Sequence, residues 1–399
     1  MNRYKSDFGV LVNNPNLVYL DSCATSLKPY QMLNKMNEYY NHYGVNIHRG
    51  VYNLSYKATE EYEDARNVVA KFINAKPSEI IFTKGTTSAL NLVAISYGLQ
   101  NIEEGDEIIT SELEHHSSLL PWMNVAKVKK AKLVYVPLDE EGRITFENVR
   151  KVVSSKTKVV ALTYISNVLG YITPIKQIIE FAKSRNIITV IDAAQAAPHL
   201  KIDVVDLGCD FLAFSAHKML GPTGLGVLFG KYRLLQKMDP IDLGGDMNDN
   251  VNKYDVEYKD APYKFEGGTP PIAEAISFKE SIKFIESIGF DHIHEHTQKL
   301  AMLAIFKLSE IEGVKVYNPT TDTGIIAFNI EGVHPHDAVS NYDEDEIAVR
   351  AGHHCAQLVS KWLNCVGTLR ASFYIYNDEN DVERFIEATI KVKEFFSKF

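Results

Sequence analysis

The chain has 399 residues, 45% of them hydrophobic and 23% charged, which are ordinary globular proportions and exclude a disordered, collagen-like or fibrous protein. Its 42 Lys and Arg residues against 51 Asp and Glu residues give a formal net charge of −9. We expect no nucleic-acid partner, because nucleic-acid-binding proteins usually carry a basic field. No apolar run approaches the roughly 20 residues that span a bilayer, and residues 1–9 lack the apolar segment of a signal peptide. We therefore expect a cytoplasmic protein without a membrane partner.

Short apolar segments rich in Val and Ile alternate with helical segments over the first part of the chain. Strands are predicted at residues 79–83, 107–110, 132–136, 159–164, 187–191, 211–215 and 226–229. Continuous apolar strands of this kind are typical of a mostly parallel sheet that is covered by helices on both faces. Helices are predicted at residues 88–97 and 175–185. This alternation predicts an α/β fold with a mainly parallel seven-stranded sheet.

The pattern changes after about Pro240. Residues 243–264 are polar and without periodicity, so we predict loops there, followed by a long helical stretch over 272–311 that is interrupted near Gly289. Strands at 324–329, 347–350 and 368–373 and helices at 335–342 and 378–398 then predict a smaller α+β lobe. We predict a large α/β domain over residues 16–285, and a small domain over residues 286–399 together with residues 1–15.

Four cysteines are present, at positions 23, 209, 355 and 365. None belongs to a C-x-x-C pair, so neither a zinc site nor a disulfide framework is expected. The default interpretation of each is a small buried hydrophobic residue.

Three predicted strands end in polar side chains at the edge where open α/β sheets bind ligands. Asp192 follows strand 187–191 and needs a cation or several donors if it is buried, although it could equally be a helix cap. Lys218 follows strand 211–215 and precedes a glycine-rich turn, where a buried amine could form a Schiff base with a carbonyl; the alternative is an exposed turn lysine. Asn167 follows strand 159–164 and is either a donor in the same crevice or a turn residue.

Two further strand ends carry hydroxyl and imidazole groups. Thr86 and Thr87 lie at a predicted helix start after a glycine, where they could cradle a phosphate or act only as caps. His115 and His116 follow strand 107–110 beside Glu114, but no third ligand with suitable spacing stands out, so we expect no metal site. A histidine stacked on an aromatic ligand is the favoured interpretation. The combination of phosphate cradle, histidine, asparagine, aspartate and lysine fits pyridoxal 5′-phosphate (PLP).

Motifs in the same order along nearly the whole chain resemble the class-V aminotransferase group of fold-type I PLP enzymes, and most closely the SUF-type (group II) cysteine desulfurases. The motifs are YLDSCATSLKP (19–29), HRG (48–50), KGTTSALNLVA (84–94), ELEHHSSLLPW (112–122), SNVLG (166–170), VIDAAQAAPH (190–199), FSAHKMLGPTGLGVL (214–228), FEGGTP (265–270), RAGHHCAQ (350–357) and RASFYIYN (370–377). The resemblance implies a PLP-dependent transferase of fold type I, with the large sheet domain and the small C-terminal domain described above.

The resemblance also implies a role for each candidate residue. Lys218 is the implied Schiff-base lysine, which also moves the substrate Cα proton, and His115 stacks on the cofactor ring. The other implied cofactor contacts are Asp192 at the ring nitrogen, Gln195 at the ring oxygen, and Thr86, Thr87, Ser215 and His217 at the phosphate, with Thr269 supplied by the second subunit of a homodimer. The implied substrate contacts are Arg370 and Asn167 at the carboxylate, with Arg350 nearby.

Cys355 is the implied nucleophile, which takes sulfur from L-cysteine as a persulfide and leaves L-alanine. A thiolate is required for this attack, and neighbouring His353, His354 and Arg350 suggest a cationic setting. The other three cysteines keep the default interpretation. The persulfide needs a sulfur-acceptor protein of iron–sulfur cluster assembly as partner.

The chain departs from the family pattern after Cys355, where the usual nearby proline is missing, and in the loop at residues 243–248. Cys365, ten residues after Cys355, could also handle sulfur. A selenocysteine lyase or cysteine sulfinate desulfinase would use the same lysine, aspartate and arginine and is the alternative on the same fold. A non-catalytic sulfur carrier or scaffold is the alternative of a different class, and the presence of Lys218, Asp192, His115 and Cys355 argues against it.

Overall fold

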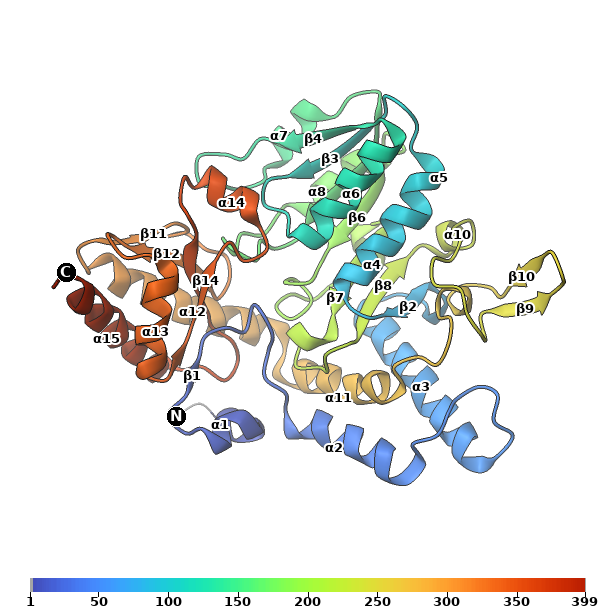
Figure 1. Cartoon of the computed structure of the whole chain (residues 1–399), viewed down its shortest axis with the longest axis horizontal. Coiled ribbons are helices and arrows are strands. Elements are labelled where there is room, and N and C mark those ends of the chain that lie inside the picture. The colour runs from blue at the N-terminus through green and yellow to red at the C-terminus, as the bar shows by residue number, and fades with distance from the viewer. Residues whose placement is uncertain (1–2, 399) are drawn as a thin grey trace.

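The computed structural model describes residues 3–398 and shows a large lobe and a smaller lobe side by side (Figure 1). The large lobe contains a seven-stranded sheet with the order β2-β8-β7-β6-β5-β3-β4. Its strands are β2 (Ile80–Thr83), β3 (Glu107–Ser111), β4 (Lys132–Val136), β5 (Thr157–Thr163), β6 (Ile188–Asp192), β7 (Phe211–Ser215) and β8 (Gly226–Gly230). Only β8 runs against its neighbours β2 and β7. The prediction of an α/β fold with a mainly parallel seven-stranded sheet is confirmed.

Both faces of this sheet are covered by helices, which explains why its strands are apolar at nearly every position. In β5, Val160 and Leu162 pack with the helices α3 (Asn53–Phe72), α8 (Ile175–Lys183) and α11 (Ile272–Ile288). The alternate residues Val159 and Ala161 pack on the opposite face with α4 (Thr86–Leu92) and α6 (His116–Lys129). Side chains alternate between the faces of a strand, so two covered faces require an uninterrupted apolar run.

Shorter helices complete the large lobe. They are α1 (Gly9–Asn13), α2 (Tyr30–Glu38), α5 (Leu99–Asn101), α7 (Phe146–Val152), α9 (Val204–Leu207) and α10 (Tyr232–Leu235). The helix predicted at 88–97 begins two residues earlier as α4 and continues as a π-helical segment over Val93–Gly98.

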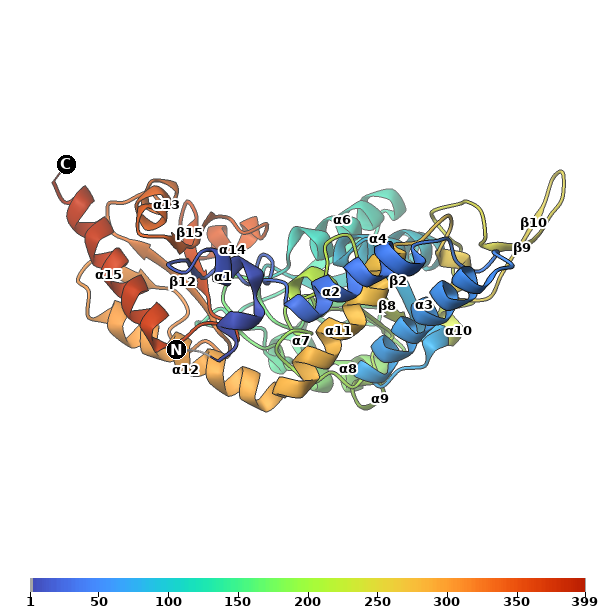
Figure 2. The same ribbon diagram turned by 90° about the horizontal axis from the view of Figure 1, so that it is seen from below.

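The small lobe is built on the antiparallel sheet β11-β12-β15-β14. Its elements are α12 (Phe290–Ser309), β11 (Val314–Val316), β12 (Ile325–Ile330), α13 (Pro335–Glu344), β13 (Ile347–Ala348), β14 (Arg350–Gly352), α14 (Gln357–Trp362), β15 (Thr368–Ser372) and α15 (Glu379–Phe396). The helical stretch from 272 breaks at Gly289, as predicted, because its φ of +88° is left-handed and suits glycine. The views in Figures 1 and 2 show α11 and α12 linking the two lobes.

Two predictions about the C-terminal half were wrong. Residues 243–264 contain the hairpin β9 (Asn248–Val251) and β10 (Val256–Tyr258), which projects from the large lobe in both views. The hairpin is exposed along most of its length, so it lacks the apolar alternation from which a strand is predicted. The single strand predicted at 347–350 is divided: β13 pairs with β1 (Val18–Tyr19), whereas β14 pairs with β15.

The segment that contains β1 lies against the small lobe. Besides the β1–β13 pairing, Val18 and Leu20 belong to the hydrophobic core of that lobe. The domain limits at residues 16–285 and 286–399 stay a prediction. Among residues 3–398, no helix combines the length and the apolar character that crossing a membrane requires.

Candidate active site

Polar side chains from both lobes meet in a cavity of about 330 Å³. Because β3, β5, β6 and β7 are parallel, their carboxyl ends lie at one edge of the sheet and bring these side chains together. The predicted site residues that line the cavity are Thr86, Thr87, His115, Asn167, Asp192, Gln195, Ser215, His217, Lys218, Arg350, Cys355 and Arg370. Of the predicted residues, Thr269 alone does not line it.

Lys218 and Asp192 place an amine and a carboxyl group in the wall of this cavity. Lys218 ends the short helical turn Ala216–Lys218 directly after β7, and burial lowers its pKa, while Cys23 and Asp192 oppose that shift. Asp192 ends β6, is 5% exposed, and accepts a hydrogen bond from the Ala194 N–H at 2.9 Å. Burial raises the pKa of Asp192, whereas this hydrogen bond and Lys218 lower it. Asp192 therefore both caps the turn that follows β6 and faces the cavity.

Hydroxyl groups gather where β2 leads into α4. The Thr86 N–H donates to Ser215 Oγ at 2.8 Å, the Thr86 and Ser215 hydroxyls lie 2.7 Å apart, and Thr87 Oγ1 lies 2.6 Å from Ser117 Oγ. A Cβ atom on Gly226 would lie only 2.4 Å from the Gly85 Cα, so glycine at 226 lets β8 approach this turn. The arrangement is a cluster of donors suited to an anion.

His217 extends this cluster toward the N-terminal segment. Its Nδ1 lies 3.2 Å from Thr25 Oγ1, and burial lowers its pKa to about 4. Lys28 donates to Thr25 Oγ1 at 3.0 Å, and burial lowers its pKa to about 8. Sequence reasoning missed Ser117, Thr25 and Lys28, since their contacts with the cluster arise only when distant segments meet.

His115 and His116 have different surroundings. His115 caps α6, where its Nδ1 accepts from the Ser117 N–H at 3.1 Å, and burial, followed by the charge of Lys218, lowers its pKa to about 4. The ring is therefore neutral at pH 7. The His116 N–H donates to the Cys355 carbonyl at 2.7 Å, and its Nε2 accepts from the Gln357 N–H at 3.2 Å. Within residues 3–398, no three His, Cys, Asp or Glu side chains are arranged to hold a metal ion.

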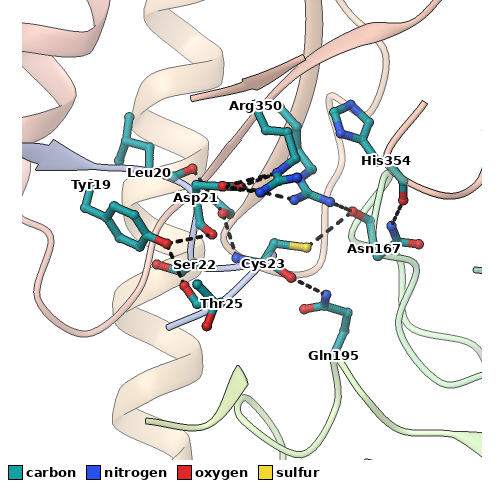
Figure 3. A network of polar contacts seen from close by, with 12 residues as sticks. Tyr19, Leu20, Asp21, Ser22, Cys23, Thr25, Asn167, Gln195, Arg350 and His354 are labelled. Atoms are coloured by element: carbon teal, nitrogen blue, oxygen red, sulfur yellow. Dashed lines mark hydrogen bonds and ion pairs between the residues drawn. The ribbon is translucent and has the colours of Figure 1, made fainter. Parts of the chain in front are cut away.

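Arg370, Asn167 and Arg350 form the polar wall on the small-lobe side. Arg370 is 2% exposed and donates from Nη1 to the Asn167 carbonyl at 2.8 Å, and its buried Nε has no hydrogen-bond partner among the described residues. The Asn167 side-chain amide donates to the His354 carbonyl at 2.8 Å. Arg350 is paired with Asp21, a residue that sequence reasoning did not single out (Figure 3).

Cys355 is the exposed thiol of the cavity rim. It lies in a tight turn in which the Ala356 N–H donates to the His353 carbonyl at 2.8 Å, and His354 and Cys355 have φ values of +52° and +55°. Two consecutive left-handed residues without glycine are strained, at about 1–3 kcal/mol each, and such strain gathers at functional sites. The carbonyl contact from His116 holds this turn against the start of α6.

The expected cationic setting of Cys355 is wrong for His354. This ring is buried, its Nε2 lies 2.9 Å from Thr368 Oγ1, and burial lowers its pKa to about 2. A neutral imidazole adds no positive charge near the thiol. The permanently charged groups that line the same cavity are the guanidinium groups of Arg350 and Arg370.

The other cysteines lie in three different environments. Cys209 is buried in the core of the large lobe, and Cys365 is half-buried in a separate groove beside Tyr317. Cys23, however, lines the active-site cavity: its thiol donates to the Asn167 carbonyl at 3.3 Å, and its own carbonyl accepts from the Gln195 side chain at 2.8 Å (Figure 3). Its buried character was predicted, but its position in the cavity wall was not.

Thr269 lies away from this cavity in the single chain. It borders a groove formed with residues 46–49 and with Gly245 and Asp246. Its loop is anchored by Glu266, which accepts bonds from the buried Arg66 at 2.7 and 2.8 Å and from the Phe82 N–H at 2.8 Å. The loop position is therefore well defined. Thr269 also borders a second groove together with Thr87, a residue that lines the cavity from its other side.

The comparisons with known proteins agree with this geometry. The family model of class-V aminotransferases matches residues 18–385. The chain belongs to this family. A probable cysteine desulfurase of Halalkalibacterium halodurans is 52% identical over 386 residues, which cover 96% of this chain and 95% of the relative.

Two solved structures are also similar over nearly the full length. The cysteine desulfurase of Thermococcus onnurineus NA1 is 39% identical with a TM-score of 0.94, and covers 99% of this chain and 98% of its own. The cysteine desulfurase CsdA of Escherichia coli is 36% identical with a TM-score of 0.93, and covers 98% of each chain. The expectations of an enzyme, of the fold type and of the cysteine desulfurase family are confirmed.

Proposed function

We propose that this enzyme uses PLP to take sulfur from L-cysteine onto Cys355, and leaves L-alanine. The observation that carries the proposal is one cavity that joins the buried amine of Lys218 to the exposed thiol of Cys355. An amine for a carbonyl cofactor and a nucleophile for sulfur therefore face the same space. The relatives' names support L-cysteine as substrate rather than selenocysteine or cysteine sulfinate.

The donors in the cavity fit PLP. Lys218 would hold its aldehyde carbon covalently, Asp192 would face the ring nitrogen, and Gln195 would face the ring oxygen. The hydroxyl groups of Thr86, Thr87 and Ser215, together with the His217 ring, would hold the phosphate. The close approach at Gly226 leaves this cradle open, since a Cβ there would displace the Gly85 turn. When bound, PLP withdraws electrons from the substrate Cα and thereby weakens the Cβ–Sγ bond.

Three residues around the cofactor site differ in which protonation state their surroundings favour. Burial of Lys218 favours the neutral amine, which can accept a proton from the substrate Cα and return it. His115 is neutral at pH 7, so its ring can stack on a cofactor without adding a positive charge to it. The Ala194 N–H holds the Asp192 side chain in place. In this position a carboxylate would stabilise a protonated ring nitrogen of PLP.

The sulfur step uses Cys355. Its thiolate attacks the substrate Sγ, so that a new S–S bond forms while the Cβ–Sγ bond breaks and its electron pair stays with carbon. Protonation of that carbon gives L-alanine, and Cys355 keeps the sulfur as a persulfide. Arg370 would bind the substrate carboxylate, helped by Asn167 and with Arg350 nearby, since its buried Nε lacks an acceptor. Because Cys355 is exposed and also lines the cavity, its thiol can receive sulfur there and present it to a partner.

The partners of this enzyme are part of the proposal. We expect a homodimer in which Thr269 reaches the phosphate site of the other subunit, because its loop is anchored through Glu266 and Thr269 does not line its own cavity. A sulfur-acceptor protein of iron–sulfur cluster assembly would dock near Cys355. The cytoplasmic location and the domain limits stay predictions.

The test is a product balance on the purified enzyme with PLP, L-cysteine and a reductant. The proposal expects equal amounts of L-alanine and sulfide, with both lost in Lys218→Ala and retained in Lys315→Ala, a matched change of a lysine outside the cavity. A supplied acceptor protein should raise the rate. Pyruvate or sulfite in place of L-alanine and sulfide would contradict the proposal.

A further inference from the structure

Two arginines of the active site lie directly opposite each other in the small-lobe sheet. Arg350 on β14 pairs with Arg370 on the neighbouring antiparallel strand β15, and both side chains line the cavity. Like charges in directly opposite positions of a sheet repel each other and are destabilising. Arg370 is fixed by burial, whereas the Arg350 side chain is 48% exposed and free to turn toward solvent. Some group must therefore hold Arg350 at the cavity.

Asp21 contacts both guanidinium groups at once, and Figure 3 shows its pair with Arg350. Its carboxylate accepts from Arg350 Nε at 3.0 and 3.1 Å and from Arg350 Nη2 at 2.8 Å, which is a bidentate pair. Its Oδ1 also accepts from Arg370 Nη2 at 3.3 Å. The Asp21 side chain is 16% exposed, between Arg350 at 48% and Arg370 at 3%, so it lies at the boundary between the solvent and the buried guanidinium group.

The backbone of Asp21 is held independently of its carboxylate. The Leu20 N–H donates to the Ala348 carbonyl at 2.9 Å, and the Leu20 carbonyl accepts from the Ser372 N–H at 2.7 Å. The Cys23 N–H donates to Ser372 Oγ at 2.9 Å. These bonds fix the segment on both sides of Asp21, so a change of its side chain should leave the segment in place.

We propose that Asp21 is a positioning residue that holds Arg350 beside Arg370 and so completes the subsite for the substrate carboxylate. This inference rests on the proposed function. Two guanidinium groups and one carboxylate leave a single positive charge, which matches one α-carboxylate. The buried Arg370 Nε, which has no partner among the described residues, supplies a donor for that carboxylate.

Removal of the Asp21 charge has a defined consequence. In Asp21→Asn the repulsion between the two guanidinium groups is no longer balanced, and the exposed Arg350 turns away while Arg370 stays. The substrate carboxylate then loses one of its two cations. Binding through the carboxylate weakens, whereas chemistry at the substrate Cα and Sγ does not require Asp21.

The experiment measures the dissociation constant of L-alanine, the product, from the change that it causes in the absorbance of the PLP-loaded enzyme. We expect Asp21→Asn to weaken L-alanine binding about tenfold, as loss of a charge-assisted contact does. Asp21→Glu should restore much of the affinity. The KM for L-cysteine should rise with little change in kcat. Asp345→Asn is the matched control, because its ion pair with Lys391 lies at the surface outside the cavity, and it should leave both constants unchanged.

A double variant separates positioning from general damage. If Asp21 acts by holding Arg350, then Asp21→Asn combined with Arg350→Gln should bind L-alanine no more weakly than Arg350→Gln alone. Unchanged or tighter binding in Asp21→Asn would overturn the proposal, because the carboxylate would then compete with the ligand or be irrelevant to it. An enzyme that fails to convert L-cysteine but shows these L-alanine affinities would refute the proposed function and leave the role of Asp21 intact.

Discussion

At the scale of single residues, Cys355 differs from the other three thiols in exposure and in backbone conformation. It is exposed and left-handed, whereas Cys23 and Cys209 are buried, and burial raises the pKa of both thiols. Thiolate character and access decide cysteine reactivity. The sequence motif identifies the position of Cys355, but its strained turn and its anchor through His116 depend on contacts between the two lobes.

Alkylation should therefore distinguish the four cysteines. With limiting iodoacetamide at pH 7.5 we expect Cys355 to react first, Cys365 more slowly, and Cys23 and Cys209 only after denaturation. Trypsin cuts after Lys5, Lys35, Lys201, Lys218, Arg350, Lys361 and Arg370, so each thiol falls in its own peptide and mass spectrometry can follow the four rates separately. Rapid labelling of Cys23 in the native enzyme would contradict the burial of its thiol.

The covalent role of Lys218 can be tested without turnover. Borohydride treatment of the PLP-loaded enzyme should fix the cofactor on the peptide that contains Lys218, and Lys218→Ala should carry none after the same treatment. Attachment at Lys28, a lysine that contacts Thr25 beside the hydroxyl cluster and whose pKa burial lowers to about 8, would show that the assignment is wrong.

At the scale of elements, the sequence predicts best where burial leaves a clear hydrophobic pattern. All seven strands of the large sheet were predicted within two residues at their ends, because strands covered on both faces are continuously apolar. The hairpin β9–β10 was missed because its residues face solvent, and the division between β13 and β14 was missed because it depends on pairing with β1. Asp21 and Cys23 follow β1, and their place in the site depends on the same pairing, which joins positions more than 300 residues apart in the sequence.

Glu114 illustrates an element-scale role that the sequence does not reveal. Its Oε1 accepts from Ser111 Oγ at 2.7 Å and from the Thr163 N–H at 3.0 Å, so one side chain joins β3, β5 and the turn that leads to His115. Burial raises its pKa to about 8. The folded enzyme thus holds this carboxyl group neutral at pH 7, next to His115 and bonded to Thr163, which both line the cavity.

This raised pKa makes stability depend on pH in a defined direction. The folded pKa lies above the unfolded value, so the stability contributed by neutral Glu114 is present at low pH and is lost as the pH rises toward about 8. Glu114→Gln removes that loss. The free energy of unfolding of this variant, measured relative to wild type by denaturant unfolding, should rise by about 2–3 kcal/mol between pH 6 and pH 8.5. Glu112→Gln is the neighbouring control, and an equal pH trend in both variants would contradict the assignment.

At the scale of the whole molecule, the central question is how one chain completes its site. Twelve of the thirteen predicted site residues line one cavity, and only Thr269 does not. The resemblance to cysteine desulfurases supplied the expectation that Thr269 acts across a dimer. Neither composition nor periodicity could indicate it, since a contact between subunits leaves no pattern in the sequence of one chain.

Mixed dimers test this expectation. Lys218→Ala has no amine in its own cavity, and Thr269→Ala would weaken the phosphate site of its partner. Co-expression of the two variants should restore about a quarter of the sites, because half of randomly formed dimers are mixed and one of their two sites is intact. Activity at limiting PLP should rise above that of either variant alone. The absence of any gain, with mixed dimers shown to form, would place Thr269 in its own subunit's site or in none.

The sulfur-bearing residue provides the most direct test of the account. The PLP-loaded enzyme is incubated with L-cysteine without reductant or acceptor, and its tryptic peptides are analysed by mass spectrometry. We expect the peptide from residues 351–361, which contains Cys355, to gain the mass of one sulfur atom, and we expect this gain to disappear when an acceptor or reductant is added. Cys355→Ala should show no such gain on any peptide and should not release sulfide, whereas Cys365→Ala should behave as wild type. Sulfur found on Cys365 or Cys23 instead, or full turnover by Cys355→Ala, would contradict the central claim.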